Sequence, residues 1–445
     1  MLTPGSLLEL AIHKPAAGGR MIARHEGQVV LVSGAIPGER VLARVERTGG
    51  GVAYAAASQV IEPSPDRRAG LADWACGGNV YAHIAYPRQR TLKAEVLADA
   101  LARIGHLAVN PAIEVAPSPE QGYRMRARLH VRDGDVGFFR EGTHELCDPA
   151  GTGQLLEETC NVIARLGLAL RARQLEGVRT VELAENIPAT ERVLHLEVDR
   201  DVDPNRLGAL FKIGSVTGLT SARAEGGRTS RTTVLHGLPF VTDALEIGAS
   251  GSDQRPLIFR RHVQAFFQAN RHLVRYLVAR VTSLMGAGRV VDLYAGVGLF
   301  ALSLASAGRD GIVAVEGDRL TAEDLRANAR PYGQSVRTLR MGVEQYLLGA
   351  SIEPGTTLIV DPPRTGMSRM AVDLLLAKHA DRIVYVSCDV ATLARDTGRL
   401  VKSGYRLEHI EAFDLFPNTA HVEALARLSL GSGSGRAGAR ADGPP

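Results

Sequence analysis

Lysine, tryptophan and cysteine are all scarce in this sequence of 445 residues. Only five of its 52 basic residues are lysines, and it has one tryptophan and four cysteines. No apolar run reaches the roughly 18 residues that a membrane-spanning helix requires. The N-terminal residues also lack the basic head, apolar middle and cleavage site of a secretory signal. We therefore expect a cytoplasmic protein without a membrane partner, with cysteines too few and too scattered for a disulfide framework.

The charge of the chain is nearly balanced. The formal net charge is +4 at pH 7, which permits nucleic-acid binding without requiring it. The preference for arginine over lysine would suit RNA, because a guanidinium makes bidentate contacts with phosphates and bases. GC-rich codon usage explains the same preference and also the many alanines and glycines. Local clusters of arginine are therefore more informative than their total number.

The length suggests about three domains. Residues 1–62 contain short apolar strands separated by glycine turns, which is typical of a small OB-like β-barrel. A proline-containing linker then opens a mixed α+β region, residues 63–255. Residues 256–430 form a third region, and the Gly-, Ser- and Ala-rich tail, residues 431–445, is predicted to be disordered.

The central region contains one helix and one basic hairpin in our interpretation. Apolar residues on one face predict a helix over residues 90–104. Residues 124–132 alternate, with Arg124, Arg126 and Arg128 on one strand face, and Asp133-Gly134 turns the chain into a second strand. This arginine row either binds RNA phosphates or is an ordinary solvated face that nearby acidic residues partly neutralise. The sequence does not decide between the two.

The third region alternates between helices and strands. A helix is predicted over residues 257–285, followed by apolar strands at residues 289–294, 311–315, 357–360 and 382–386 with helical segments between them. Such alternation predicts a parallel, doubly wound Rossmann-like α/β sheet. Ligands of such sheets bind outside the carboxyl ends of the strands, so the residues at these ends are candidates for the functional site.

A glycine loop follows the first of these strands. Gly296 and Gly298 would let the backbone approach an adenosine-containing cofactor, and Glu316 ends the next strand, where it can accept hydrogen bonds from ribose hydroxyls. The Gly-x-Gly-x-x-Ala pattern by itself also fits a nicotinamide dinucleotide. Asp292, four residues before Gly296, favours S-adenosylmethionine (SAM) instead, because methyltransferases carry an acid at this strand end.

Three further clusters follow later strands. In Asp361-Pro362-Pro363-Arg364 the two prolines fix the backbone that carries the Asp361 carboxylate. Cys388 follows a strand and precedes a helix, where the helix N-terminus is expected to lower the pKa of its thiol. A lone cysteine is more often a small buried apolar residue, so position alone does not make it a nucleophile. His421 and Glu423 are predicted to share one face of the last strand.

Together these clusters resemble those of the SAM-dependent RNA 5-methyluridine (uracil-C5) methyltransferases. The resemblance rests on strings that occur in the family's order: Phe266-Phe267-Gln268-Ala269-Asn270, Asp361-Pro362-Pro363-Arg364, Ser387-Cys388 with Ala391-Thr392-Leu393-Ala394-Arg395-Asp396, and Phe416-Pro417 with His421-Val422-Glu423. The segment from Gly18 to Val41 resembles the TRAM domain, the RNA-binding barrel of this family.

The resemblance implies the roles of individual residues. Cys388 would be the nucleophile and Glu423 the general base, while Gln268, Tyr294, Glu316 and Asp361 would line the cofactor and target pocket. It further implies a class I SAM methyltransferase domain, an α+β central domain that binds RNA, and ribosomal or transfer RNA as substrate. We expect a monomer that does not act on DNA.

The residue types suit this chemistry. Carbon 5 of uracil becomes nucleophilic only after a thiolate adds at carbon 6, and a base must then remove the proton from carbon 5. A non-catalytic RNA-binding protein on the same scaffold is the alternative, although the intact Cys388, Glu423 and Asp361 argue against it. A nicotinamide-dependent oxidoreductase would rest on the glycine loop alone.

This sequence departs from the family at two places. Many relatives bind an iron–sulfur cluster through four cysteines, two of them in a Cys-Gly-Gly-Cys string, whereas here the string is Cys76-Gly77-Gly78-Asn79. Cys76 and Cys147 alone are too few for a cluster, so we predict its absence, no bound metal, and two ordinary cysteines. In addition, Asp389-Val390 replaces the usual Asn-Pro after the nucleophile.

Overall fold

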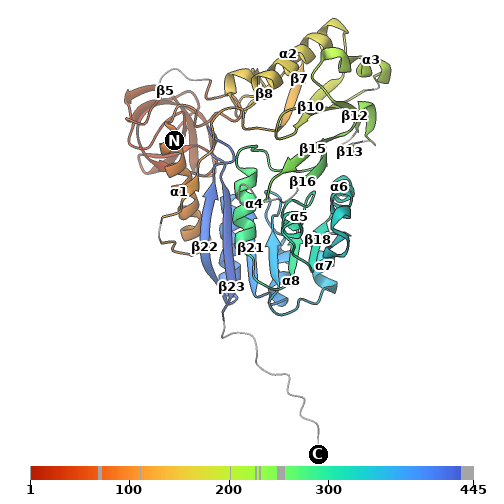
Figure 1. Cartoon of the computed structure of the whole chain (residues 1–445). Coiled ribbons are helices and arrows are strands. Elements are labelled where there is room, and N and C mark those ends of the chain that lie inside the picture. The colour runs from red at the N-terminus through yellow and green to blue at the C-terminus, as the bar shows by residue number, and fades with distance from the viewer. Residues whose placement is uncertain are drawn as a thin grey trace, which may run out of the picture.

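The computed structural model consists of a barrel, a central sheet with helices, and a C-terminal sheet covered by helices, in that order along the chain (Figure 1). It describes residues 2–68, 73–110, 112–200, 202–225, 228–229, 232–247 and 256–431. The tail predicted to be disordered lies outside these residues except for Gly431. Among the described residues, no helix is both long enough and apolar enough to cross a membrane.

The N-terminal strands close into a barrel in the order β1-β2-β3-β5-β4, as the sequence predicts. The strands are β1 (Leu7–Pro15), β2 (Met21–His25), β3 (Gln28–Ser33), β4 (Arg40–Gly49) and β5 (Val52–Glu62). Alternate residues point inward and are buried, which gives the barrel its own apolar core. Closure leaves no unpaired strand edge on the barrel.

The central part is a mixed sheet with helices on one face. Its strand order is β13-β12-β11-β10-β7-β8-β9, and β14 pairs with β12. The strands are β7 (Arg126–Arg132), β8 (Asp135–Phe139), β9 (Leu146–Cys147), β10 (Val178–Glu185), β11 (Arg192–Val198), β12 (Gly218–Glu225), β13 (Arg228–Thr229) and β14 (Thr233–Gly237). The helices α2 (Glu157–Ala172) and α3 (Pro204–Gly208) lie on the side of the sheet that faces away from the C-terminal part (Figure 1).

The C-terminal part is the predicted doubly wound α/β domain. Five strands run parallel in the order β19-β18-β17-β20-β21, and β23 and β22 continue the sheet with antiparallel pairings. The strands are β17 (Val290–Leu293), β18 (Ile312–Glu316), β19 (Val336–Arg340), β20 (Thr357–Val360), β21 (Arg382–Ser387), β22 (Tyr405–Phe413) and β23 (Glu423–Leu430). The predicted strands at residues 289–294, 311–315, 357–360 and 382–386 are thereby confirmed.

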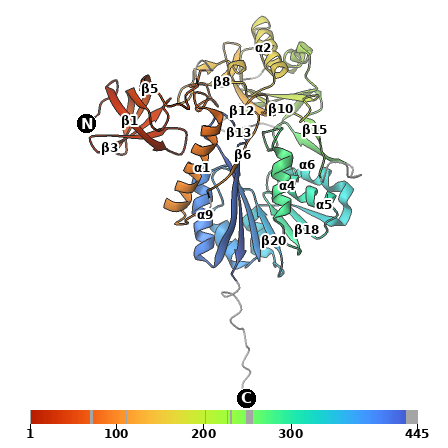
Figure 2. The same ribbon diagram turned by 60° about the vertical axis from the view of Figure 1, so that its left-hand side comes forward.

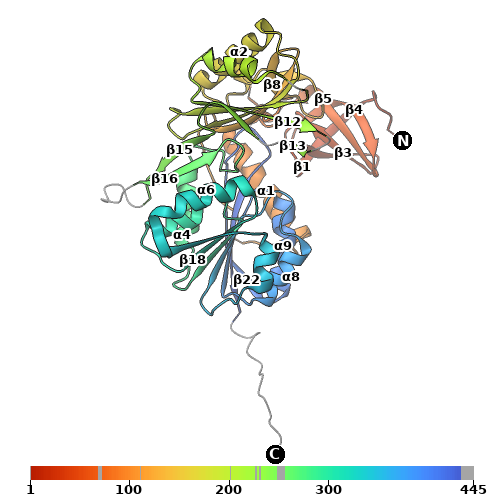
Figure 3. The ribbon, with the colours of Figure 1, turned by 90° about the vertical axis from the view of Figure 1, so that its right-hand side faces the viewer.

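Helices cover both faces of this sheet (Figure 3). One face packs against α4 (Val274–Ser283), α5 (Leu299–Ser306) and α6 (Arg319–Ala329). The other packs against α1 (Tyr86–Arg103), α7 (Val343–Gly349), α8 (Arg369–Ala377) and α9 (Val390–Lys402). The helix predicted over residues 90–104 is therefore present as α1, although it begins earlier.

The helix predicted over residues 257–285 is wrong in its first part. The residues at its start form β16 (Leu257–His262), which pairs antiparallel with β15 (Phe240–Leu245), and only α4 is helical. Buried and exposed residues alternate along β16, a pattern of period two that the longer helical run obscured.

We keep residues 63–255 and residues 256–430 as proposed domains. Two strand pairings nevertheless join residues on opposite sides of this boundary. The first joins β15 to β16, and the second joins β6 (Val115–Ala116) to β22 at the edge of the C-terminal sheet.

Candidate active site

The glycine loop begins at the end of β17, in the interior of the C-terminal sheet. Gly296 has a φ of +57° and Gly298 a φ of +101°, both in the left-handed region that favours glycine. A Cβ atom built on Gly296 meets no atom within 4 Å, so this part of the loop faces open space. The loop can therefore approach a ligand closely, as a SAM-binding loop must.

Glu316 is fixed directly against this loop. It ends β18, and its carboxylate accepts hydrogen bonds from the backbone N–H groups of Gly296 (2.9 Å) and Asp318 (2.7 Å). Burial raises the pKa of Glu316 above its usual value, while these backbone bonds favour the charged form. Its orientation beside the glycine loop is the one expected of a carboxylate that binds ribose hydroxyls.

Asp292 lies behind the loop rather than in it. Its side chain is fully buried and accepts a hydrogen bond from the backbone N–H of Ala301 at 3.0 Å, near the start of α5. Burial raises the pKa of Asp292 to about 8. Asp292 thus holds the first turn of α5 in place, and the strand-end acid that favoured SAM supports the loop from inside the core.

Three of the four predicted cofactor residues line one pocket. Gln268, Tyr294 and Asp361 meet there with Gly296, and the amide of Gln268 donates to a carboxylate oxygen of Asp361 at 3.5 Å. Phe266, which is 60% exposed, also lines this pocket. The fourth residue, Glu316, contacts the pocket through Gly296. Segments far apart in the sequence therefore converge beside the glycine loop, and their side chains suit a cofactor with an adenosine group.

Cys388 follows β21 and directly precedes the helix α9. The Asp389 side chain caps this helix by accepting hydrogen bonds from the backbone N–H groups of Ala391 (3.1 Å) and Thr392 (2.8 Å). These N–H groups are the ones that would otherwise stabilise a thiolate at the helix N-terminus. The Asp389 that replaces the usual Asn therefore preserves a capped helix start.

The expected lowering of the Cys388 pKa is wrong for this structure. Burial, together with the negative charges of Glu423 and Asp361, raises the pKa of the thiol to about 12. Arg364 opposes these effects through its positive charge and a side-chain hydrogen bond to Cys388. Arg364 is therefore the group that favours the thiolate here, a role that the sequence analysis missed.

Glu423 is the first residue of β23 and is only 3% exposed. The strands β21 and β23 pair antiparallel, and Ser387 at the end of β21 lies opposite Ala424 of β23. Cys388 and Glu423 are therefore cross-strand neighbours. Burial, and then the charge of Asp361, raise the pKa of Glu423 well above its usual value. Burial also raises the pKa of Asp361 to about 7. The two carboxylates and the thiol form one electrostatically coupled group.

His421 does not share a strand face with Glu423. The strand begins at Glu423, and His421 lies in the preceding loop, where its backbone N–H donates to the Thr419 hydroxyl. The loop also packs the rings of Phe416 and His421 edge to face. The predicted pairing of His421 with Glu423 on one strand is therefore wrong.

The arginine row of the hairpin is largely paired with carboxylates. Arg128 forms ion pairs with Glu182 and Glu197 on neighbouring strands, and Arg126 lies 3.8 Å from Glu182. Arg124 lies outside the hairpin strands, and its guanidinium donates to the Gln154 amide oxygen at 2.6 Å. The hairpin itself is confirmed, and these ion pairs favour a solvated face over a phosphate-binding one.

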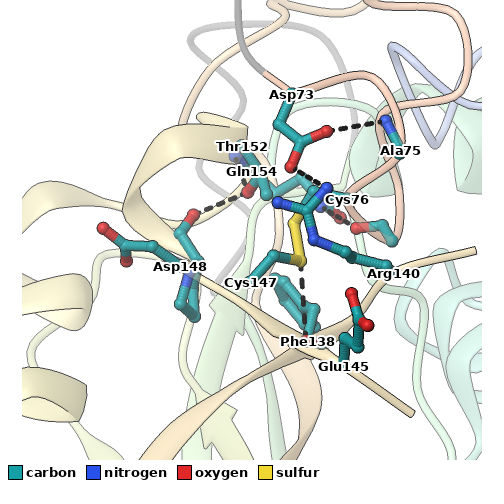
Figure 4. Close-up of a disulfide and its surroundings, with 12 residues drawn as sticks. Asp73, Ala75, Cys76, Phe138, Arg140, Glu145, Cys147, Asp148, Thr152 and Gln154 are labelled. Atoms are coloured by element: carbon teal, nitrogen blue, oxygen red, sulfur yellow. Dashed lines mark hydrogen bonds and ion pairs between the residues drawn. A yellow bond between two sulfur atoms is a disulfide. The ribbon is translucent and has the colours of Figure 1, made fainter. Parts of the chain in front are cut away.

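Cys76 and Cys147 form a disulfide, which corrects the expectation of two ordinary cysteines (Figure 4). The bond joins the segment after the linker to β9, beside an ion pair between Asp73 and Arg140. The sequence separation of 71 residues gave no sign of this proximity. Among the described residues, no group of three or more His, Cys, Asp or Glu side chains could hold a metal ion. The absence of an iron–sulfur cluster remains a prediction.

Comparison with known proteins places these features in a family. Residues 315–429 match the family described as tRNA (Uracil-5-)-methyltransferase, and residues 2–57 match the TRAM domain. A 23S rRNA (uracil(1939)-C(5))-methyltransferase RlmD of Pseudomonas entomophila is 35% identical over 96% of this chain and 94% of its own length. The chain belongs to the RNA uracil-C5 methyltransferases. As a member of this family, it is a SAM-dependent enzyme with an N-terminal TRAM barrel, as the resemblance implied.

Another relative and a solved structure show how much of the chain is similar to known proteins. An uncharacterized RNA methyltransferase of Streptomyces coelicolor is 32% identical over 95% of this chain and 93% of its own length. The crystal structure of the Pyrococcus abyssi tRNA (uracil-54, C5)-methyltransferase with S-adenosyl-L-homocysteine superimposes with a TM-score of 0.74. It is 25% identical and covers 94% of this chain and 99% of its own. The similarity therefore spans barrel, central part and methyltransferase domain.

Proposed function

We propose that this uracil-C5 methyltransferase acts on a uridine of RNA through a covalent bond between the Cys388 sulfur and carbon 6 of the base. The observation that carries this proposal is the cross-strand placement of Cys388 and Glu423 beside Asp361 and Arg364. A nucleophile and a base that must act in turn on adjacent atoms of one ring need such proximity.

The reaction begins with the Cys388 thiolate. Its sulfur forms a bond to carbon 6, and the electrons of the double bond move to give an enolate whose carbon 5 is nucleophilic. SAM supplies the methyl group that carbon 5 receives. The ionised Glu423 then takes the proton from carbon 5, the double bond re-forms, and the bond between carbon 6 and sulfur breaks to return the thiolate.

Three further side chains, Arg364, Gln268 and Asp361, support these steps. Arg364 donates a hydrogen bond to Cys388 and stabilises the thiolate. Gln268 and Asp361 contact one another beside the glycine loop, where they can orient the cofactor and the base against each other. Burial of the site also limits access of water to the adduct.

Ribosomal RNA is the first substrate to test. Relatives above 30% identity carry names for 23S rRNA methyltransferases, whereas the superimposed crystal structure is that of a tRNA enzyme at 25% identity. The experiment incubates the protein with labelled SAM and separated pools of unmodified ribosomal and transfer RNA, followed by nucleoside analysis. Labelled 5-methyluridine in the ribosomal pool supports the proposal, label only in transfer RNA changes the substrate, and binding of RNA without methylation supports the non-catalytic alternative.

A further inference from the structure

The loop of residues 414–422 sets the position of Glu423. It connects β22 to β23, and Glu423 is the first residue after it. In the pairing of these strands Glu423 lies opposite Phe413, the last residue of β22. Both ends of the loop therefore lie next to the carboxylate, and a shift of the loop would move Glu423 relative to a bound uridine.

The helix α1 holds this loop through a buried ion pair. The Lys93 ammonium donates to the Asp414 carboxylate at 2.5 Å and to the backbone carbonyl of Phe416 at 3.0 Å. The side chains of Lys93 and Asp414 are both 0% exposed. One cation thus fixes the first and third residues of the loop, and Asp414 directly follows the strand partner of Glu423.

A second side chain of α1 holds the middle of the loop. Gln89, one helical turn before Lys93, donates from its amide to the Asn418 side chain at 2.9 Å and accepts from the Asn418 backbone N–H at 2.9 Å. Asn418 has a φ of +63°, so its backbone conformation is one that needs support from neighbouring groups. Residues i and i+4 of a helix lie on one face, which explains why Gln89 and Lys93 reach the same loop.

The helix itself is anchored on two sides. Leu92 packs into the core of the barrel, whereas Leu97 and Leu101 pack into the core of the methyltransferase sheet. Figure 2 shows α1 between the barrel and α9. The helix is therefore a rigid support for the loop, formed by a segment more than 300 residues earlier in the chain.

A buried ion pair of this kind contributes geometry more than stability. Burial lowers the pKa of Lys93, and the charge of Asp414 opposes that shift. Removing two charges from water costs free energy that their attraction roughly repays, so well-packed apolar residues often stabilise a fold as well. Unlike an apolar contact, the pair also requires specific positions of the Asp414 carboxylate and the Phe416 carbonyl.

We propose that Lys93 is a positioning residue for catalysis, which holds the loop of residues 414–422 so that Glu423 lies within reach of the proton on carbon 5. The inference rests on the proposed function, since it assigns Lys93 to the step in which Glu423 acts. Cys388 follows β21 and precedes α9, whereas the hydrogen bonds of the Lys93 ammonium go to Asp414 and Phe416. The attack of the thiolate is therefore independent of Lys93, and the release of the methylated product depends on it.

The test replaces both members of the pair, Lys93→Met with Asp414→Asn, so that no unpaired charge is left buried. In a single turnover with SAM and substrate RNA, we expect attack and methyl transfer at rates close to those of the parent enzyme. Elimination becomes slow, so the fraction of RNA held as a methylated covalent complex on a denaturing gel should rise about tenfold. SAM affinity, measured by calorimetry, should be unchanged.

A matched control comes from the same strand. Arg280 of α4 pairs with Glu411 of β22 at 2.9 Å, so its guanidinium is bonded to the strand rather than to the loop. The double change Arg280→Met with Glu411→Gln should leave the fraction of covalent complex at the parent level. A folded Lys93/Asp414 variant that slows all steps equally, or accumulates no complex, overturns this inference alone. If the parent enzyme itself forms no covalent complex with 5-fluorouridine RNA, the proposed function fails, and this inference with it.

Discussion

Cys388 and Glu423 occupy facing positions at the ends of two adjacent antiparallel strands. The pairing of Ser387 with Ala424 requires this placement, because each catalytic candidate is the next residue outward from the pair. The strand register places the backbones of the two residues side by side, while the position of the Glu423 side chain also depends on the loop of residues 414–422 that precedes it. The thiol and the base can therefore act on neighbouring atoms of one uracil ring.

Substitution of these two residues should stop the reaction at different steps. Cys388→Ala removes the addition at carbon 6, so neither a covalent complex nor 5-methyluridine should form. Glu423→Gln keeps the size of the side chain but cannot accept the proton from carbon 5. The Glu423→Gln protein should therefore accumulate a methylated RNA complex that survives denaturing electrophoresis. RNA with 5-fluorouridine should trap the parent enzyme in the same way, because fluorine does not leave as a proton.

Two results would contradict these predictions for Cys388 and Glu423. If Cys388→Ala still produces 5-methyluridine, the covalent mechanism fails. Normal product release by Glu423→Gln would instead assign the base to another group, with the nearby Asp361 as the first candidate.

Replacement of Arg364 by alanine should move the activity to higher pH. The thiol of Cys388 must ionise, and Arg364 is the cation that lowers its pKa against burial and two carboxylates. Without Arg364 the folded thiol pKa is higher still, so the rising limb of kcat/KM should shift upward by about one pH unit. The rate of thiol alkylation against pH, measured in a Cys160→Ser background, reports the same ionisation without catalysis. An unchanged alkylation profile would exclude this role for Arg364.

Asp292 should make the stability of the protein fall as pH rises. Its carboxyl has a pKa of about 8 in the folded protein against 3.8 as its ordinary value. Between these values the folded protein keeps a proton that the unfolded chain has lost, so each rise in pH favours unfolding. The variant Asp292→Asn does not titrate, so its free energy of unfolding should rise relative to that of the parent by about 4 kcal/mol between about pH 5 and about pH 8. Denaturant unfolding at several pH values measures this, with the exposed Asp373→Asn as control.

The disulfide between Cys76 and Cys147 should contribute measurably to stability. It closes a loop across 71 residues of sequence separation, and loss of such a link typically costs about 2–4 kcal/mol. Dithiothreitol should therefore lower the melting temperature of the parent protein but not that of Cys147→Ala.

Protein prepared without oxygen should contain no stoichiometric iron and show no broad visible absorbance. Iron near four atoms per chain, the content of a [4Fe–4S] cluster, would overturn the prediction that no cluster is bound.

Alanine at Arg126 and Arg128 should leave the salt dependence of RNA binding nearly unchanged. Both guanidiniums already face Glu182, and Arg128 also pairs with Glu197. A protein cation steepens the salt dependence of RNA binding only if it displaces counterions from the phosphates. Affinity titrations at several salt concentrations test this directly. A slope that flattens in the variant would show that these arginines exchange their carboxylate partners for RNA phosphates.

Most of the architecture and the candidate residues could be predicted from the sequence. Glycine turns and alternation predicted the barrel, and strand–helix alternation predicted the doubly wound sheet, because these patterns reflect local geometry with periods of two and 3.6 residues. The motifs placed Asp361 and Cys388 just after strand ends, where ligands of such sheets bind, and Glu423 on the last strand. Gln268, in contrast, fell within the helix predicted over residues 257–285.

The interactions between these residues could not be predicted from the sequence, because they depend on the tertiary structure. The pKa of Cys388 is raised rather than lowered because burial and the charges of Glu423 and Asp361 come from segments distant in sequence. The disulfide, the contact of Arg364 with the thiol, and the pairing of Lys93 with Asp414 are likewise long-range contacts. A sequence pattern records the neighbours of a residue along the chain. Charge, dielectric surroundings and hydrogen-bond partners depend instead on neighbours in space, which exist only once the chain has folded.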